Sequence, residues 1–462
     1  MTTDTTEAKP PRKGRWIDHW DPEDKDFWAG TGRKVANRNL GFSIFAEHIG
    51  FSMWTIWSVL VLFMGPEYGI DAAGKFFLVA LPALIGSLIR FPYTMAPARF
   101  GGRNWTIVSA LLLLIPTILG LIVMQPGTSY TTFMIVAAIA GLGGGNFASS
   151  MANINTFFPE GRKGWALGLN AGGGNLGVAA VQLLGLLVIA LTGTASPRLL
   201  LGVYLPFIVI AAVCAALYMD NITSVRNDTG AMREAVKDHQ TWVMSFLYIG
   251  TFGSFIGYSF AFGLVLQNQF GRTPLQAASI VFLGPLIGSF IRPVGGWLAD
   301  RYGGGKVTFW TFVGLVAFTG AALIASSQKS LPLYTIAFLS LFVLSGLGNG
   351  STYKMIPSIF AGRARLEIDA GMAKDVALMK ARRLSGAVIG IAGAIGALGG
   401  VFINLAFRQS FLTTKSGDSA FWTFLVFYVV CGVVTYVVYL RRAPVSASDD
   451  EPAHPRLAYA GV

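Results

Sequence analysis

Residues 84–90 read Leu-Ile-Gly-Ser-Leu-Ile-Arg, and residues 286–292 read Leu-Ile-Gly-Ser-Phe-Ile-Arg. The two stretches differ at one position, and each places an arginine inside an apolar run. A second pair recurs at nearly the same offset, with Gly-Leu-Gly-Gly-Gly at 141–145 and Gly-Leu-Gly-Asn-Gly at 346–350. Two independent matches at nearly the same offset indicate that the chain consists of two related halves.

The composition is that of a membrane protein. Hydrophobic residues make up 53% of the 462 residues and charged residues 13%, whereas soluble domains carry about 25% charged residues. The 56 glycines would weaken a soluble helical protein, but in a bilayer they allow helices to approach closely. The two cysteines, Cys214 and Cys431, lie in apolar runs, which argues against a disulfide framework or a zinc site.

About twelve segments reach the length of about 20 mostly apolar residues that a spanning helix needs. We therefore expect an all-α integral membrane protein with six transmembrane helices in each half. The expected spans of the first half are 38–64, 71–98, 104–124, 130–157, 163–192 and 200–219. The expected spans of the second half are 240–268, 273–300, 306–327, 332–360, 383–408 and 419–440.

The polar stretch 220–239 is expected to be the central cytoplasmic loop that joins one half at 38–219 to the other at 240–441. Lys and Arg are concentrated in the loops on the side of the N-terminus, which the positive-inside rule assigns to the cytoplasm. The tails 1–37 and 442–462 are then cytoplasmic, and the first tail lacks the apolar core of a cleavable signal. The net charge of +12 therefore reflects topology and does not indicate nucleic-acid binding.

Arg90 and Arg292 lie at equivalent places inside spans of the two halves. An arginine at this depth is costly unless it faces a cavity and has a partner. The alternative, a buried ion pair with an intramembrane acid, has one clear candidate, Glu47. Two positive charges facing a common cavity therefore predict an anionic substrate. A planar guanidinium suits nitrate, nitrite and carboxylates alike.

Glycine-rich segments occupy 141–155, 168–177 and 386–400. Spacings of three and four residues place these glycines on one helical face, where they favour close helix packing. Asn170 and Asn175 lie in the second segment, although a packing face needs no amide. Because an amide is a neutral donor, we expect Asn175 to bind the anion and Asn170 to be a weaker ligand.

The stretch 141–177 contains Asn-Phe-Ala-Ser-Ser-Met, Phe-Phe-Pro and Gly-Gly-Asn-Leu-Gly, and 346–357 reads Gly-Leu-Gly-Asn-Gly-Ser-Thr-Tyr-Lys-Met-Ile-Pro. These stretches resemble the two signature segments of the nitrate/nitrite porters of the major facilitator superfamily. The resemblance extends to Trp-Asp-Pro-Glu-Asp at 20–24 and to Thr-Phe-Gly-Ser-Phe-Ile-Gly-Tyr-Ser at 251–259. Residues 296–306 resemble the cytoplasmic loop motif of the superfamily.

This resemblance implies a major facilitator fold with two pseudo-symmetric six-helix halves that work by alternating access. It also implies a binding site in which paired arginines clamp the anion and aromatic rings close it from above and below. The residues of this chain that look like that site are Arg90, Arg292, Tyr258, Asn175, Phe147 and Phe262.

Glu47 and His48 lie in the first span, where some exchangers of the family carry only apolar residues. A protonatable pair would suit nitrate–proton symport. The alternative is that both side chains lie near the cytoplasmic end of the span, where they are hydrated and structural. Lys354, in the second signature segment, either raises the positive potential along the anion's path or snorkels to the interface.

We expect a secondary transporter of the inner (cytoplasmic) membrane that exchanges nitrate for nitrite. The alternatives are proton symport of nitrate and transport of a carboxylate or another small anion. A receptor would carry an extra signalling domain, and a haem-bearing oxidoreductase subunit would need paired intramembrane histidines, whereas the four histidines here are scattered. We expect no enzymatic activity, no cofactor, no metal and no nucleic-acid partner, and a functional monomer in the lipid bilayer.

Overall fold

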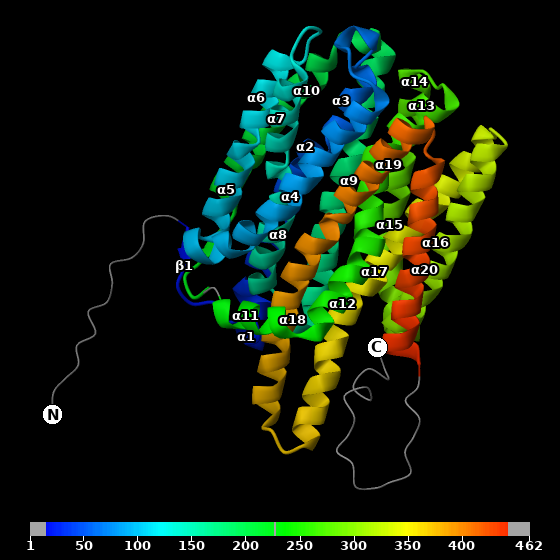
Figure 1. The fold of residues 1–462 in the computed structure, drawn as a ribbon. Coiled ribbons are helices and arrows are strands. Elements are labelled where there is room, and N and C mark those ends of the chain that lie inside the picture. The colour runs from blue at the N-terminus through cyan, green and yellow to red at the C-terminus, as the bar shows by residue number, and fades with distance from the viewer. Residues whose placement is uncertain (1–14, 226–227, 442–462) are drawn as a thin grey trace, which may run out of the picture.

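The computed structural model describes residues 15–225 and 228–441. Within these ranges the protein is a bundle of long helices that run side by side (Figure 1). Eleven helices are long and apolar enough to cross a membrane, or up to twelve when a bent pair at the start of the chain is taken as one span. The expectation of an all-α membrane protein with about twelve spans is therefore confirmed. The outer parts of the two expected tails, residues 1–14 and 442–462, lie outside the described residues.

The first half contains ten α-helices and three short turns of other helix types. They are α1 (Lys25–Phe27), η1 (Trp28–Gly32), α2 (Arg33–Thr55), α3 (Trp57–Phe63), η2 (Pro66–Tyr68), α4 (Ala72–Phe100), α5 (Gly102–Leu112), α6 (Leu114–Val123), α7 (Tyr130–Ala140), α8 (Leu142–Phe157), α9 (Glu160–Thr192), η3 (Gly193–Ala195) and α10 (Pro197–Tyr218). Several spans are thus built from two helices that meet at a short break, such as α5 with α6 and α7 with α8.

The second half repeats this organisation. Its helices, with the central one included, are α11 (Thr229–Lys237), α12 (His239–Tyr248), η4 (Ile249–Gly253), α13 (Ser254–Phe270), α14 (Pro274–Val281), α15 (Leu283–Tyr302), α16 (Gly304–Ser327), α17 (Leu331–Asp369), α18 (Lys374–Ala397), α19 (Gly399–Thr414), α20 (Asp418–Thr435) and η5 (Tyr436–Leu440).

The segment 220–239 contains a strand and a helix. Strand β2 (Asn221–Ile222) pairs in parallel with β1 (Trp16–Ile17) near the N-terminus, and Asp220 forms ion pairs with Arg15 and Arg38. Helix α11 is bound to the second half instead, because Arg383 on α18 pairs with Asp228 at its N-terminus. The connection is therefore attached to both halves.

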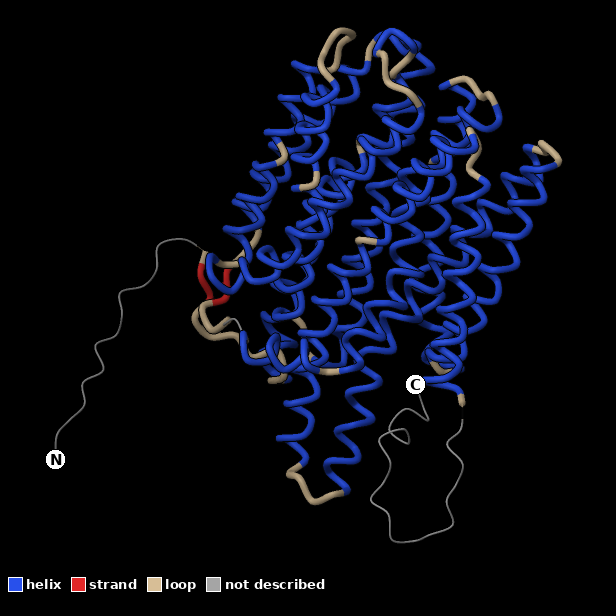
Figure 2. The backbone as a smooth tube through the Cα atoms, viewed as in Figure 1, coloured by secondary structure: helices blue, strands red, loops and turns tan. Residues whose placement is uncertain are grey.

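Helices α17 and α18 extend well beyond the spans expected from hydropathy. The expected spans ended at 360 and resumed at 383, whereas only residues 370–373 are non-helical in the structure. The intervening residues are rich in Ala, Arg, Leu, Lys and Met, which favour helix but include too many charges for a transmembrane window. The two helices form a hairpin that projects beyond the bundle on the face where the last described helical turn, η5, ends (Figures 1 and 2).

The two halves pack tightly near the face opposite the α17–α18 hairpin. Phe76 on α4 stacks against Phe407 and Phe411 on α19, with ring centroids 5.5 and 5.2 Å apart. The span formed by α12, η4 and α13 runs through the centre of the protein, and 94% of the residues in its most apolar stretch are buried. The core is therefore continuous between the halves, and the candidate site lies within it.

Candidate functional site

Arg90 lies in the middle of α4 and is 1% exposed. Its Nε donates a hydrogen bond to the carbonyl oxygen of Gly144 on α8 at 3.1 Å, and its Nη1 donates to the carbonyl oxygen of Gly393 on α18 at 2.8 Å. Gly144 belongs to the first half and Gly393 to the second, so Arg90 joins the two halves. Its Nη2 is buried and has no hydrogen-bond partner among the described residues.

Three aromatic rings surround the Arg90 guanidinium. Its Cζ lies 5.2 Å from the ring centroid of Trp54, 4.7 Å from that of Phe147 and 5.2 Å from that of Phe252. Phe147 and Phe252 come from different halves and stack with centroids 6.2 Å apart. Aromatic faces stabilise a cation but carry no net negative charge. The three rings therefore hold the guanidinium in place without neutralising its positive charge.

Arg292 occupies the equivalent position on α15 and is 5% exposed. Its Cζ lies 5.6 Å from the ring centroid of Tyr353, and the hydroxyl of Tyr248 lies beside its guanidinium. That hydroxyl in turn donates to Oδ1 of Asn349 at 2.7 Å. Arg90 and Arg292 lie close enough for each to act electrostatically on the other.

Neither guanidinium has an anionic partner in its contacts. In the part of the chain that the structure describes, all the arginine ion pairs are formed by other arginines, not by Arg90 or Arg292. Several buried polar atoms around the pair also have no hydrogen-bond partner: Arg90 Nη2, Arg292 Nη1, Asn349 Nδ2 and the Tyr353 hydroxyl. A buried donor without a partner costs about 1–3 kcal/mol. A set of unpaired donors beside two cations is therefore suited to a small anion with several acceptor oxygens.

Asn175 and Asn170, both on α9, have different environments. Asn175 is completely buried, and neither atom of its amide has a partner among the described residues, as a ligand-binding amide would require. Asn170 Nδ2 instead donates to Glu47 Oε2 at 2.6 Å and to Ser150 Oγ at 2.8 Å. The donor of Asn170 is therefore occupied within the protein, which corrects its expected role as an anion ligand.

Glu47 is completely buried, although one interpretation of the sequence placed it at a hydrated end of the span. It lies between α2, α8 and α9, where its Oε2 accepts hydrogen bonds from the Ser150 hydroxyl and from Asn170. The neighbouring His48 points elsewhere, with Nδ1 3.1 Å from the carbonyl oxygen of Gly173. The two residues therefore do not act on each other as a pair.

Tyr258 and Phe262 are not brought to the arginines. The hydroxyl of Tyr258 is hydrogen-bonded to that of Tyr428 at 2.5 Å, and Phe262 stacks on Phe338 with centroids 4.0 Å apart. Phe262 lies ten residues beyond Phe252, about 15 Å along a helix. These two residues belong to an aromatic cluster that lies away from the arginines, toward the face opposite the α17–α18 hairpin. This corrects their expected place beside the anion.

Tyr248 and Phe252 occupy the places that Tyr258 and Phe262 were expected to fill. They are four residues apart and so lie on the same face of the helix, toward Arg292 and Arg90. The seventh span contains two tyrosines and several phenylalanines, and the family resemblance alone did not distinguish them. Asn349 was part of a signature segment, but no role was assigned to it.

Lys354 forms an ion pair with Asp300 on α15 at 3.0 Å, and about two fifths of its side chain is exposed. Because the carboxylate neutralises the ammonium, the expected increase in positive potential along an anion path is not supported. The partial exposure agrees better with the alternative, a side chain that extends toward the interface.

Glycines allow the helices around the site to cross closely. A Cβ on Gly346 of α17 would lie 2.3 Å from the carbonyl oxygen of Gly288 on α15, and a Cβ on Gly295 would lie 2.0 Å from that of Leu347. In the first half, a Cβ on Gly143 would lie 2.3 Å from the carbonyl oxygen of Gly50. The contact of Gly143 agrees with the packing role predicted for the segment 141–155, whereas a Cβ on Gly386 or Gly393 would meet no atom within 4 Å.

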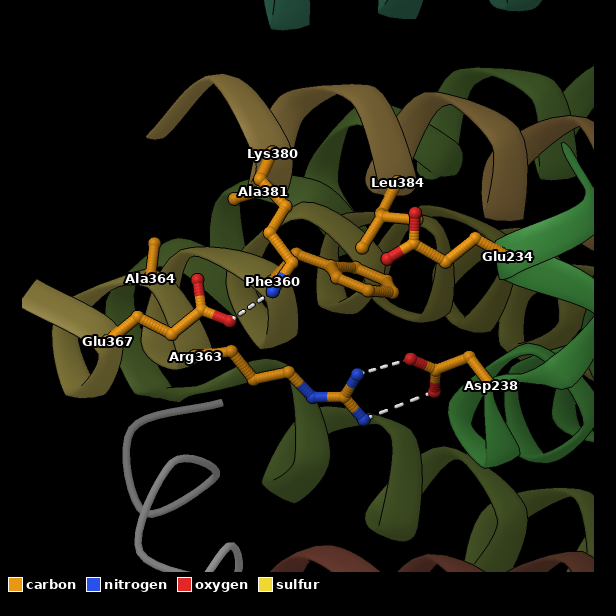
Figure 3. Close-up of a pocket in the computed structure, with 9 residues that line it drawn as sticks. All are labelled: Glu234, Asp238, Phe360, Arg363, Ala364, Glu367, Lys380, Ala381 and Leu384. Carbon is orange, nitrogen blue, oxygen red and sulfur yellow. Dashed lines mark hydrogen bonds and ion pairs between the residues drawn. The ribbon is translucent and has the colours of Figure 1, made fainter. Parts of the chain in front are cut away.

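A separate pocket lies at the base of the α17–α18 hairpin (Figure 3). Arg363 forms a two-pronged interaction with Asp238, and Lys380 donates to Glu367 at 2.6 Å. Because these cations and acids are paired with each other, this pocket is a poor candidate for the anion site. The arginine pair remains the best one.

Comparisons with known proteins agree with this fold. The family model of the Major Facilitator Superfamily matches residues 40–403. The chain is 35% identical to the nitrate/nitrite transporter NarU of Salmonella typhimurium, covering 93% of this chain and 97% of that protein. It is 32% identical to the probable nitrate/nitrite antiporter NarK2 of Thermus thermophilus, covering 93% and 98%.

A solved structure of a D-xylose-proton symporter shares the fold with a TM-score of 0.64 at 15% identity, covering 88% of this chain and 97% of that one. At 15% identity this match supports only the assignment of the fold. The family model and the two relatives together identify the family. The chain belongs to the Major Facilitator Superfamily and, within it, to the family of the nitrate/nitrite transporters.

Proposed function

We propose that this protein is a secondary transporter that exchanges nitrate for nitrite by alternating access. One observation carries the proposal: Arg90 and Arg292 are buried at equivalent positions of the repeat, and among the described residues neither has a carboxylate ion pair and each has an N–H without a partner. Two such donors match a planar oxyanion. The two relatives described above are named for nitrate and nitrite, which supports this choice of anion.

In the proposed complex, the anion accepts hydrogen bonds from Nη2 of Arg90 and Nη1 of Arg292. Tyr248, whose hydroxyl lies beside Arg292, is then close enough to orient the ion, and the rings of Phe147 and Phe252 form the wall beside Arg90. Asn175 remains a proposed ligand because its buried amide is unpaired.

The proposed exchange follows from the charges. A bound monovalent anion offsets the mutual repulsion of the arginines, whereas an empty site leaves two buried positive charges with only partial compensation. The loaded form therefore changes its orientation more readily than the empty form. In major facilitator transporters the halves rock about a midplane site, and Arg90 already joins the halves through Gly393.

We also propose an inner-membrane location with both termini in the cytoplasm and a functional monomer. The concentration of Lys and Arg in the loops on the side of the termini supports this orientation.

Liposomes reconstituted with the protein test the exchange. Nitrate uptake is measured with nitrite inside the liposomes, with sulfate inside, and with no internal anion other than buffer. We expect uptake to be fastest with internal nitrite. Equal uptake under all three conditions would contradict exchange, and an absence of nitrate uptake in all three would contradict nitrate transport.

A further inference from the structure

A groove of about 450 Å³ lies on the outer surface of the second half. It runs between the end of α15 and the start of α16, and α17 forms its floor. Helix α16 is one of the outer helices of the bundle (Figure 1), so the groove faces the lipid. Its interior is apolar, because the half-buried side chains of Leu298, Leu344 and Leu347 line it.

The rim of the groove carries aromatic side chains that are typical of a membrane–water interface. Tyr302 and Trp310 both line the groove, and both are exposed, Trp310 to 67%. Trp and Tyr rings are enriched at the level of the lipid headgroups. The turn between α15 and α16 lies on the side of the α17–α18 hairpin, because α16 leads away from that side and α17 returns to it. The rim therefore marks the headgroup level of the leaflet on the hairpin side.

The mouth of the groove is positively charged. Lys306 lines it and is exposed, and among the described residues neither Lys306 nor Arg301 forms an ion pair. The nearby acid, Asp300, is paired with Lys354 instead. Arg301 Cζ lies 5.5 Å from the ring centroid of Tyr302 at the rim. Helix α16 begins without a side-chain cap, so the positive end of its dipole adds to the charge of Lys306.

The equivalent turn of the first half is covered by the protein itself. Asn104 corresponds to Lys306, since each lies fourteen residues after the arginine of its half. The backbone N–H of Asn104 donates to Oδ1 of Asn221 on β2 at 3.3 Å, and a Cβ on Gly101 would lie 2.3 Å from that oxygen and 3.0 Å from the ring of Trp16. In the described residues of the second half, no strand covers the turn between α15 and α16. The place that an acceptor of the protein occupies in the first half is therefore available to an external acceptor in the second.

We propose that this groove binds an anionic glycerophospholipid, such as phosphatidylglycerol, from the leaflet on the hairpin side. One acyl chain lies along the groove against the leucines, and the phosphate pairs with Lys306 at the rim. An anionic phospholipid brings a flexible apolar chain and a negative charge in one molecule. A zwitterionic lipid brings the chain without the net charge, and free phosphate brings the charge without the chain. Basic pockets between transmembrane helices are the places where anionic headgroups bind.

The test measures lipid binding to the purified full-length protein. The delipidated protein in detergent is mixed with dioleoyl phosphatidylglycerol, with dioleoyl phosphatidylcholine or with inorganic phosphate. Native mass spectrometry gives the Kd of the first bound lipid, and thermal unfolding gives the melting temperature, which a ligand of the folded state raises. One basic residue near a membrane surface strengthens the binding of anionic lipid roughly fivefold. We therefore expect the wild type to bind the first phosphatidylglycerol about fivefold more tightly than the first phosphatidylcholine.

Three variants separate the charge from the groove. Lys306→Gln removes the charge, so we expect it to bind the two lipids equally. Lys329→Gln is the matched control, because Lys329 is an exposed lysine at the other end of α16 and forms no ion pair in the described part of the chain; it should retain the preference of the wild type. Leu298→Trp fills the groove with a larger side chain, so both lipids should bind more weakly.

Equal affinity of the wild type for the two lipids would overturn the proposal, and so would an unchanged preference in Lys306→Gln. If inorganic phosphate raises the melting temperature as much as phosphatidylglycerol does, the ligand is a free anion and the lipid assignment is wrong. If Lys306→Gln does not fold, Leu298→Trp decides, and wild-type affinity for the first lipid in that variant contradicts binding in the groove. These outcomes leave the proposed exchange of nitrate for nitrite untouched, because Arg90 and Arg292 are not part of the groove.

Discussion

Replacing Arg90 by lysine retains the charge but removes the geometry of the guanidinium. The arginine uses Nε and Nη1 to bind the carbonyl oxygens of Gly144 and Gly393 and so directs the unpaired Nη2 toward the anion. A lysine ammonium is a single point with donors that cannot hold both carbonyls and the anion in the same directions. The loss of one hydrogen bond to a charged group costs about 1.5–3 kcal/mol, which is roughly a 10- to 100-fold weaker Kd for nitrate.

Two measurements check this value. Calorimetry gives the nitrate Kd of Arg90→Lys in detergent, and nitrate counterflow into nitrite-loaded liposomes gives the transport rate. We expect counterflow close to that of empty liposomes, because the variant also loses a bond that joins the two halves. Arg292→Lys should behave similarly, since Arg292 is the equivalent residue of the repeat.

Arg408→Lys is the matched control. Arg408 on α19 also lies against an aromatic ring, 5.2 Å from the centroid of Phe77, and it is not part of the arginine pair. This variant should transport normally. A nitrate Kd for Arg90→Lys within about twofold of the wild type, far below the 10-fold minimum derived above, would refute the argument that the fork geometry holds the anion.

Three further changes have distinct expected outcomes. Tyr248→Phe should weaken nitrate binding roughly 5- to 10-fold by loss of a hydroxyl that lies beside Arg292 and is proposed to orient the anion, whereas Tyr258→Phe should leave the Kd unchanged; calorimetry compares the two. Gly346→Ala should lower the melting temperature in thermal unfolding and the yield of folded protein, because its Cβ would meet a backbone carbonyl of α15 at 2.3 Å. Arg383 lowers the pKa of Asp228, so the ion pair stabilises the docking of α11 above the ordinary aspartate pKa, and this stabilisation is lost as the pH falls through the lowered value. Limited proteolysis before α11 should therefore increase at acidic pH, and Arg383→Gln should show the faster cleavage already at neutral pH.

The repeat made the central feature of the site predictable from the sequence. Arg90 and Arg292 end two nearly identical heptapeptides, and a repeated sequence in a membrane protein implies repeated structure. Hydropathy then located the spans, because apolar composition is required of any helix in lipid. The position of the cations followed from the same pattern, and the structure places both arginines in the buried core.

The choice among the aromatic residues of the seventh span could not be made in this way. A helix with one buried face shows which side points inward through its periodicity. This span is buried on all sides, so its apolar residues carry no such signal. The rotation of the helix, which brings Tyr248 and Phe252 to the arginines and Tyr258 to Tyr428, is set by packing against both halves.

Two other features, both involving charged residues, could not be predicted from the sequence. The extension of α17 and α18 is helical but charged, and a hydropathy window that selects apolar segments excludes it. Glu47 was recognised as an intramembrane acid, but its partners Ser150 and Asn170 come from helices about one hundred residues away. No local pattern predicts such contacts, because they depend on the way in which α2 crosses α8 and α9.

The hydrogen bond from Arg90 to Gly393 offers a physical reason for preferring exchange to net transport. It connects a binding-site cation of one half to the backbone of the other, so rocking the halves apart at this point must break it. A bound anion supplies replacement acceptors for the guanidinium as the bond breaks, whereas an empty site leaves the buried donor unpaired. Net transport then requires another way to reduce the cost of the empty form.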